Sequence, residues 1–584
     1  MKQFGKKARV GIAFLLSFLI MALYFVVVYQ KIPFIYDIND DVAMRNVAAG
    51  VITGEPDAHL IFVKYILGLV ISGLYRLLPG FDWYGLVMIG IMLLSFGMIL
   101  YRGLVAEQGA LWKLGYTVMG LLLFTCVGLQ HLSAFQWTVT AAMAGAAGIY
   151  LFYTSEIQDR FQNIFEEGMA VFLLLLCMAI RQSVFLMMFP VAAICFWWRY
   201  GSFARNGKWP VTLKHWAVPA ALLAGMLLIL GVERIAYHSG EWKEFLAYNT
   251  DRSTIMDYYE LKNYEEQSAF YDSLGLTPEE VENLQRYSLY LAEDVYGEKM
   301  HLLAENASET HRQQYSVSGR LFLGIEKVYE HLNKDSYAPV HMLSLFIVAA
   351  VLGLAFGKNK RQFWLGIVLC SILALFWLYL GFKGRIVDRV GYSMYLLTFL
   401  SMLAVGYRTL ILERKERQSR IFVSGLTVGV CLFLAMLAYI KWDEVKANNT
   451  WRSEYNLQFL DVNRYMAEHM ENVYFMTTFS IETYTDNFTV GRDFAFSNLL
   501  SVGGWHTFSP LENVKAEKLG ISEPKRDIVE MENVYLISLE NVSLGYMDRY
   551  FESLYGEKYQ GREMVDTLVY GGAVFEVYDF TKEE

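Results

Sequence analysis

Long apolar runs are the feature that most limits what this chain can fold into. The 584 residues are 55% hydrophobic and only 19% charged, whereas soluble proteins carry about 25% charged residues. Most of the apolar segments are close to the ~20 residues that cross the ~30 Å hydrocarbon core of a bilayer. We therefore predict an α-helical, multi-pass membrane protein. The apolar segments are residues 10–28, 60–78, 84–101, 115–129, 137–153, 168–180, 183–198, 217–235, 341–356, 363–380, 391–405 and 421–440.

Basic residues outside these segments predict how they are oriented. Lys and Arg accumulate on the cytoplasmic side of membrane proteins, and here they cluster at the N-terminus and in three later loops. The N-terminus is then cytoplasmic, and an even number of crossings must precede Arg199. Seven apolar segments precede Arg199, so either one of them does not cross or the pair 168–180 and 183–198 makes a single crossing. Segment 60–78 is interrupted by Lys64 and Arg76, so we predict that it is interfacial or re-entrant and that eleven segments cross. The three basic loops are residues 199–214, 358–361 and 408–420.

This orientation divides the chain into two predicted domains. Residues 1–440 form a multi-pass transmembrane domain, with a first outer loop at 30–59 and an outer helical region at 238–340. Residues 441–584 form a small extracytoplasmic α/β domain, because a helical pattern is followed by strand-like runs. We expect the protein in the plasma membrane, in a bacterium. The helical pattern covers 453–470, and the strand-like runs are 473–478, 534–538, 567–570 and 573–578.

The first outer loop concentrates acidic side chains beside the membrane, where charge is costly, and such a cluster predicts a functional site. The predicted orientation brings polar groups of later outer segments to the same surface. Cations in the short loop 382–390 run against the charge rule, which predicts an anionic ligand such as a phosphate. The candidate site residues are Asp37, Asp40, Asp41, Asp57, His59, His131, Gln136, Arg181, Lys383, Arg385 and Arg389.

Carboxylates and cations on one membrane face suit sugar transfer from a polyprenyl-phosphate donor. Lys or Arg would stabilise the charge that develops on the leaving phosphate. A carboxylate would accept the proton of the acceptor hydroxyl as a general base, and we name Asp40 and Asp41 as the candidate catalytic residues. If the reaction uses a divalent cation such as Mg²⁺ or Mn²⁺, the same two residues would hold it through oxygen ligands.

Three short motifs resemble the GT-C superfamily of integral membrane glycosyltransferases, which includes protein mannosyltransferases, lipid A aminoarabinose transferases and oligosaccharyltransferase catalytic subunits. They are the acidic pair Asp40-Asp41 in the first outer loop, the Pro-containing turn 55–60, and a helix pair interrupted at Arg181. Where several members have a second acidic residue in the second outer loop, this chain offers His131 and Gln136.

The resemblance spans residues 1–400 as an architecture and implies a GT-C-like fold. It also implies transfer of a sugar from a polyprenyl-phosphate-linked donor at the outer membrane face, with inversion at the sugar carbon. The acceptor would be a glycan, a lipid or a protein. The predicted partners are thus the bilayer, the donor and the acceptor, and no nucleic acid.

Each motif also has a purely structural interpretation. Asp40 or Asp41 would cap a helix over 42–49 that Gly50 ends, and Arg181 would reach the interface as a long amphipathic side chain. The cations of loop 382–390 would pair with Asp388 or lipid headgroups. The remaining structural interpretations are a helix start at Asp57 and His59, interfacial polar residues at His131 and Gln136, and a turn with a packed Trp505 at 503–506.

Two other function classes also fit the sequence. A transporter or flippase of lipid-linked sugar would suit the many apolar segments, although no two matching halves are visible. A non-catalytic envelope-assembly protein would keep the architecture without the reaction. Substitution of Asp40 and Asp41 would distinguish an enzyme from these two alternatives, because only an enzyme would lose sugar transfer.

Overall fold

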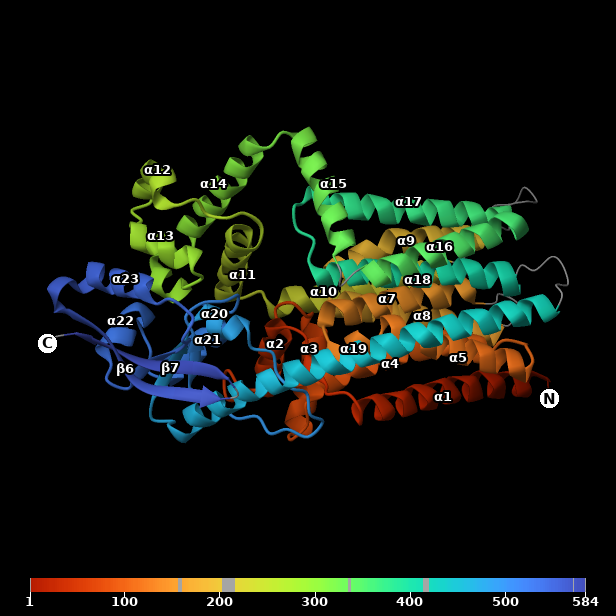
Figure 1. The fold of residues 1–584 in the computed structure, drawn as a ribbon, viewed down its shortest axis with the longest axis horizontal. Helices are drawn as coiled ribbons and strands as arrows, with labels where there is room; N and C mark the ends of the chain where they lie inside the picture. The colour runs from red at the N-terminus through yellow and green to blue at the C-terminus, as the bar shows by residue number, and fades with distance from the viewer. Residues whose placement is uncertain are drawn as a thin grey trace.

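The structure is a computed structural model, which describes residues 2–155, 160–201, 216–334, 338–412, 420–570 and 572–582. Within these residues, nine helices are long and apolar enough to span a membrane, and they lie side by side as one bundle (Figure 1). The predicted multi-pass helical fold is confirmed. The helices are α1 (Lys2–Tyr29), α4 (Trp83–Leu104), α5 (Ala110–Val127), α8 (Arg160–Ile180), α9 (Gln182–Gly201), α10 (Ala217–Ala236), α16 (Ala338–Lys358), α17 (Lys360–Phe382) and α18 (Asp388–Tyr407).

Two further helices run with these nine. Helix α7 (Trp137–Thr154) is buried along its whole length, and α19 (Arg420–Glu468) is a 49-residue helix that passes along the bundle and beyond it (Figure 1). Segment 60–78 contributes only the 13-residue helix α3 (Tyr65–Leu77). At 1.5 Å per residue α3 is about 20 Å long, too short for the ~30 Å hydrocarbon core.

The polar parts of the chain gather at one end of the bundle. The N-terminus lies at the opposite end, far from the C-terminus (Figure 1). Helices of the first outer loop and of region 238–340 lie together with the C-terminal domain (Figure 1). Of the predicted cytoplasmic cations, Arg205, Lys208, Lys214, Arg414, Lys415 and Arg417 lie outside the described residues.

Short helices and turns build this polar end. The predicted capping box at Thr277 is present, since its hydroxyl accepts from the Glu280 backbone and the Glu280 carboxylate accepts from the Thr277 N–H. The helices here are α2 (Asn39–Ala49), α6 (Leu129–Ser133), α11 (Gly240–Ser253), α12 (Ser268–Ser273), α13 (Pro278–Gln285), α14 (Glu298–Gln314) and α15 (Val317–Asn333). Two-residue strands β1 (Ile35–Tyr36) and β2 (Ala134–Phe135) pair in parallel.

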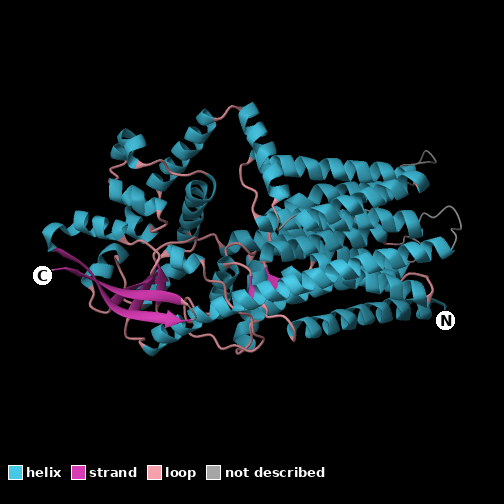
Figure 2. Ribbon diagram, viewed as in Figure 1, coloured by secondary structure: helices cyan, strands magenta, loops and turns pink. Residues whose placement is uncertain are grey.

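The C-terminal domain contains a mixed sheet, drawn in magenta in Figure 2. It has five strands in the order β4-β3-β5-β7-β6. Strand β3 pairs in parallel with β4 and β5, and β7 pairs antiparallel with β5 and β6. The strands are β3 (Val473–Met476), β4 (Leu499–Ser501), β5 (Val534–Leu539), β6 (Tyr559–Tyr570) and β7 (Ala573–Lys582). The accompanying helices are α20 (Thr478–Glu482), α21 (Pro510–Lys518), α22 (Pro524–Glu530) and α23 (Gly545–Tyr555).

Alternation along β3 explains how the sheet is covered. Successive strand side chains point to opposite faces, so Phe475 packs in a core with α22 and α23. Tyr474 and Met476 pack with Phe459 of α19 on the other face. The predicted helix at 453–470 is the last part of α19, and the proposed domain boundary at 440 falls inside this continuous helix.

Candidate active site

Helix α2 carries Asp40 and Asp41 in its first turn, where the helix dipole favours negative charge. The cap position is Ile38, and no side chain caps the helix end. The hypothesis that Asp40 or Asp41 caps the helix is therefore wrong. Gly50 ends the helix in the left-handed conformation with φ of 86°, as predicted.

Asp40 lies against arginines from distant parts of the chain. Its Oδ2 is 4.0 Å from an Nη of Arg389 at the start of α18, and its side chain is 19% exposed. Burial raises the pKa of the Asp40 carboxyl, and Arg389, Arg181 and a hydrogen bond from Trp505 only partly offset this effect. Asp40 is thus a partly accessible carboxylate that accepts a proton more readily than an ordinary aspartate.

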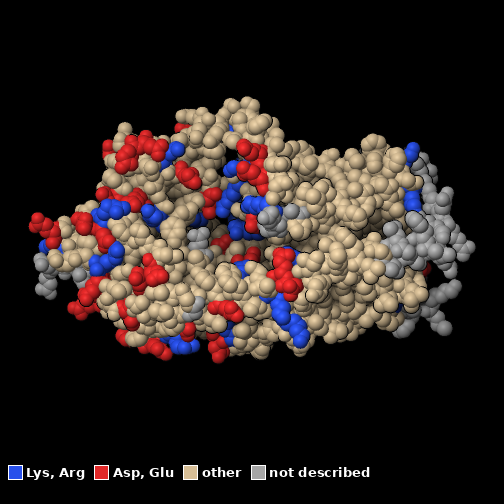
Figure 3. Space-filling model, in the orientation of Figure 1, with Lys and Arg blue, Asp and Glu red and all other residues tan. Residues whose placement is uncertain are grey.

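A second carboxylate and two more arginines extend this group of charges. Asp257, from the π-helical turn after α11, is 3.4 Å from Arg385 and 3.7 Å from Arg252. Four guanidinium groups, including that of Arg181, therefore face two carboxylates. We call this group of six side chains the arginine cluster. It carries two more positive than negative charges. Figure 3 shows basic side chains gathered around a hollow between the bundle and the polar end.

Arg181 is held by aromatic rings. Its guanidinium lies 4.0 Å from the ring centre of Trp137 and 5.6 Å from that of Phe62, and Phe62 in turn contacts Trp505 at 4.7 Å. Within the described residues Arg181 forms no ion pair. Burial, with the nearby Arg389, lowers its pKa to about 10, so it stays charged at neutral pH. Cation–π contact orients the charge without neutralising it.

Asp41 has a different environment from Asp40. It is fully buried, and its Oδ1 accepts hydrogen bonds from the Tyr84 hydroxyl at 2.8 Å and the Trp137 backbone N–H at 3.2 Å. Burial raises the pKa of Asp41 well above that of an ordinary carboxyl. The structure therefore ties Asp41 to α4 and α7, and it separates the two carboxylates that the sequence presents as a pair.

The remaining acidic candidates of the first loop have close partners. Asp37 binds Arg452 of α19 at 2.7 Å. Asp57 lies 2.7 Å from His59 Nδ1, and hydrogen bonds with His59 lower the pKa of Asp57 although burial opposes them. The imidazole of His59 stacks on Trp242 at 4.6 Å. These contacts join the first loop to α11 and α19.

Three other candidate site residues make contacts that belong to the fold. Gln136 caps α7 by accepting from the Val139 backbone N–H at 3.0 Å. His131 is buried in α6, and burial lowers its pKa to about 3. Lys383 ends α17, with its ammonium over the Tyr379 ring.

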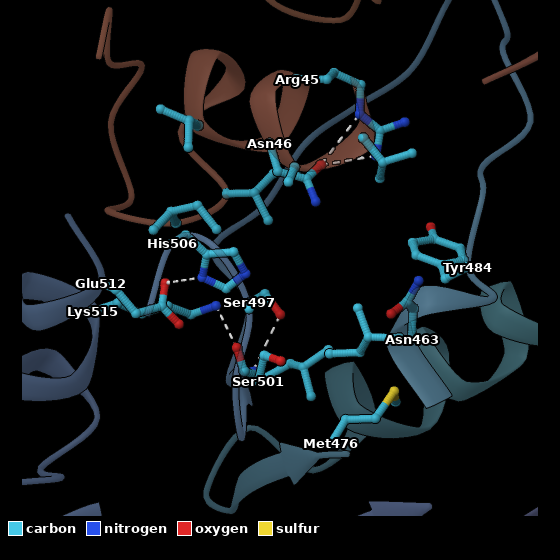
Figure 4. Close-up of a pocket in the computed structure, with 18 of the residues that line it drawn as sticks. Arg45, Asn46, Asn463, Met476, Tyr484, Ser497, Ser501, His506, Glu512 and Lys515 are labelled. Atoms are coloured by element: carbon cyan, nitrogen blue, oxygen red, sulfur yellow. Dashed lines mark hydrogen bonds and ion pairs between the residues drawn. The ribbon is translucent and has the colours of Figure 1, made fainter. Parts of the chain in front are cut away.

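A cavity of about 350 Å³ adjoins helix α2 on the side of the C-terminal domain. Asn46 of α2, Asn463 of α19 and Ser501 of β4 lie on different walls (Figure 4). His506 lies 3.4 Å from the buried Glu512, so this acidic group has a basic partner. Trp505 also lines the cavity, which places the cavity next to Asp40.

Around Asp40 and Asp41, the residues that the structure describes do not gather a set of metal-binding side chains. In the described part of the chain, no group of three or more His, Cys, Asp or Glu residues is positioned to hold a metal ion. The carboxylates of Asp40 and Asp41 also contact different partners. Mg²⁺ takes oxygen ligands and often binds through one or two carboxylates and substrate phosphates.

Sequence reasoning missed two of the six charged members of the cluster and one aromatic neighbour. Asp257 and Arg252 lie in an acidic and aromatic stretch where no spacing distinguishes them. The sequence predicts a turn with a packed Trp505, and this segment does form a turn, but the indole also contacts Asp40. No local signal marks these residues, because each reaches the site through the packing of region 238–340 or of the C-terminal domain.

No family model matches this chain, and no curated protein sequence matches it. Two solved structures are similar to it. ArnT from Cupriavidus metallidurans in the apo state is 9% identical, with 97% of this chain and 98% of that chain covered and a TM-score of 0.38. ArnT from Cupriavidus metallidurans bound to undecaprenyl phosphate is 8% identical, with 96% and 97% covered and a TM-score of 0.39. The likeness is one of overall architecture only.

Proposed function

We propose that this protein is a membrane glycosyltransferase that uses a polyprenyl-phosphate-linked sugar at the outer membrane face. The observation that carries the proposal is the placement of Asp40 beside the arginine cluster. An excess of fixed positive charge beside the bilayer attracts a phosphate, and a carboxylate with a raised pKa is suited to accept a proton. A lipid-phosphate sugar that reacts with a hydroxyl is one ligand that requires both the positive charge and the proton-accepting carboxylate.

In the proposed reaction, an acceptor hydroxyl attacks the anomeric carbon of the sugar from the face opposite the phosphate. The new glycosidic C–O bond forms as the bond from the anomeric carbon to the phosphate oxygen breaks, so the configuration inverts. The bonding electrons leave with the polyprenyl phosphate. The hydroxyl proton passes to the Asp40 carboxylate, which later returns it to solvent.

The arginines have two parts in this proposal. Arg389 and Arg385 lie at the start of α18 and just before it, where they would bind the phosphate and stabilise the charge that develops on it. Arg181 adds its charge from between the rings of Trp137 and Phe62. These rings, with Trp505, also offer apolar faces for the sugar ring.

The cavity beside α2 is the proposed acceptor site. Asn46, Asn463 and Ser501 offer donors and acceptors suited to hydroxyl groups. Its volume of about 350 Å³ lies within the range of small-molecule sites. Asp41 would hold α2 in place and would not contact the reacting atoms.

The test uses purified protein in proteoliposomes, with radiolabelled polyprenyl-phosphate pentoses and hexoses as donors and an envelope extract as acceptor. Wild-type protein should consume one donor and release polyprenyl phosphate. Asp40→Asn should lose this activity, and Asp443→Asn, at an exposed position of α19, should keep it.

Equal turnover by wild type and Asp40→Asn would contradict the proposed base. Passage of intact donor across the vesicle membrane without its consumption would instead identify a transporter. A folded wild type that neither consumes nor moves any donor would favour the non-catalytic alternative.

A further inference from the structure

A second cavity, of about 400 Å³, lies between α14, α15 and the turn that joins α17 to α18. Four basic side chains line it, and Glu260 is the one carboxylate among its lining residues. The cavity borders the arginine cluster, because Tyr258 lines it and also lies under the Arg385 guanidinium at 5.2 Å. The basic residues are Lys262, His311, Arg320 and Lys327.

Lys262 lies 3.9 Å from Glu266, but among the described residues two other cations of this cavity have no acidic partner. In the described part of the chain, neither Arg320 nor Lys327 forms an ion pair. Arg320 lies over the Phe382 ring at 5.0 Å with its Nε buried and without a hydrogen-bond partner, and Lys327 donates only to the Gly384 carbonyl, at 2.8 Å. Burial, together with the charges of Arg320 and Lys327, lowers the pKa of His311. An anion would satisfy all three groups.

Helix α15, which supplies Arg320 and Lys327, also presents an apolar stripe to the outside. The exposed side chains recur at helical spacing, with Phe322 76% and Ile325 48% exposed. They face away from the protein, because the opposite side of the helix packs on α17. The stripe, which we call the α15 stripe, is Val317, Leu321, Phe322, Ile325 and Tyr329.

The position of α15 in the fold indicates what the α15 stripe contacts. A Cβ at Gly324 would lie 2.7 Å from the Gly381 carbonyl carbon, so the backbones of α15 and α17 touch where α17 ends. Helix α15 crosses the end of the bundle (Figure 1). That end is where an apolar spanning helix leaves the hydrocarbon core. An amphipathic helix at this depth lies in the interface, with its apolar side toward the acyl chains.

We propose that α15 lies in the outer-leaflet interface and that the cavity behind it binds the phosphate headgroup of an anionic bilayer lipid. The apolar stripe contacts the acyl region, and Arg320, Lys327 and His311 contact the phosphate. This site is additional to the proposed donor site at Asp40. A phospholipid held there would border Tyr258 and Arg385 without taking part in transfer.

The first experiment measures lipid retention. Protein from nanodiscs of phosphatidylcholine with phosphatidylglycerol is analysed by native mass spectrometry. The double variant Arg320→Gln, Lys327→Gln should retain phosphatidylglycerol at least about tenfold less than wild type, because it loses two charge-assisted contacts. The matched control, Lys299→Gln with Arg312→Gln, removes two charges of α14 that do not line the cavity and should retain the lipid.

Three results would overturn the proposal. Equal retention by the double variant and wild type would exclude these residues as the headgroup site. Equal retention of phosphatidylcholine and phosphatidylglycerol by wild type would exclude a site for anionic lipid. Stabilisation of lipid-free protein by inorganic phosphate alone, without any lipid preference, would identify a site for free phosphate instead.

The second experiment measures the depth of α15. A nitroxide at Ile325→Cys should relax through oxygen dissolved in the acyl region, and one at Glu330→Cys, on the exposed polar side, should relax through a water-soluble nickel reagent. Water exposure at both positions would contradict the interfacial placement. Neither experiment requires sugar transfer, so their outcome is independent of the proposed function.

Discussion

Two charged clusters meet helix α2, and they differ in how completely their charges are paired. At the start of α2, Asp40 joins the arginine cluster, with N–O separations of 3.4 to 4.0 Å and a net positive charge. One turn further on, Arg45 is buried in a second group, which we call the Arg45 network. Its members are Arg45, Asp82, Asp486 and Arg492.

The Arg45 network is compact and neutral. Asp486 binds both Arg45 and Arg492 at 2.7 Å, and Asp82 accepts from the Tyr36 hydroxyl at 2.6 Å. Two guanidinium groups balance two carboxylates, with Arg45, Asp82 and Asp486 almost wholly buried. It joins the first loop to the segment after α20, which also pairs with β1 through Asn487.

In the proposed function, this difference separates structural from functional charge. Removing one member of a buried, fully paired group leaves an uncompensated charge, so such a group tolerates little change and offers nothing to a ligand. Charges that are held apart and in excess can instead be paired by a ligand. The Arg45 network joins α2 to the C-terminal domain, whereas the proposed role of the arginine cluster is to bind the donor phosphate.

The largest effect on activity is expected from Asp40→Asn. The amide cannot accept the acceptor proton, so sugar transfer should fall by about 10²- to 10⁴-fold while the melting temperature stays close to that of wild type. Donor consumption in proteoliposomes and thermal unfolding in detergent measure the two effects. Loss of both sugar transfer and thermal stability in this variant would show that Asp40 has a structural role.

The largest effect on stability is expected from Asp486→Ala. The change leaves buried Arg45 without its closest partner, which should cost about 3–5 kcal/mol of unfolding free energy. Thermal unfolding against the exposed control Asp443→Asn measures this cost. Undiminished stability would show that the Arg45 network is not what holds the two domains together.

Arg389→Gln should have an intermediate effect. Removing one charged contact to the leaving phosphate should lower kcat/KM by about 10- to 100-fold, with little change in melting temperature because Arg389 is only loosely paired with Asp40. Arg464→Gln, at an exposed position of α19, is the matched control. A similar loss of kcat/KM in both variants would show that the arginine cluster has no special role in transfer.

The pH dependence should also separate the two clusters. Burial raises the pKa of Asp40, so the active carboxylate forms as pH rises through that value, and transfer is lost on acidification. Arg45 and Arg492 hold the pKa of Asp486 below its usual range although burial opposes them. The stability from Asp486 is therefore present above an unfolded pKa of about 3.9 and is lost as pH falls through the lower folded value.

Acidification should thus abolish transfer before it unfolds the protein. Transfer rates and melting temperatures measured across the same pH series would check this order. Loss of both together would contradict the separation of the two clusters.

The smallest effect is expected from Asp41→Asn. Because burial raises the pKa of Asp41, the folded state favours its neutral form, and an amide oxygen can still accept from Tyr84 and Trp137. Unfolding free energy should change by no more than about 1 kcal/mol, and transfer should remain. A loss as large as that of Asp40→Asn would make both carboxylates catalytic.

Much of the architecture was predictable because it depends on local properties of the chain. Segment length and apolar content predicted the helical bundle, and the charge rule predicted that 60–78 would not cross, which agrees with the short α3. The distribution of charged residues in the sequence also predicted Arg181, Arg385 and Arg389 as members of the candidate site. Their side chains do converge near Asp40.

Hydrophobicity, helix length and charge bias act over short stretches of chain, so the amino-acid sequence was enough to predict a membrane bundle, its polar end and the acidic turn at Asp40. The inward orientation of Asp41, the approach of Asp257 and Trp505 to Asp40, and the pairing of Arg45 with Asp486 became visible only in the folded chain. Asp40 and Trp505 are more than 400 residues apart. Contacts over such separations depend on how whole domains pack, and no local pattern encodes that packing.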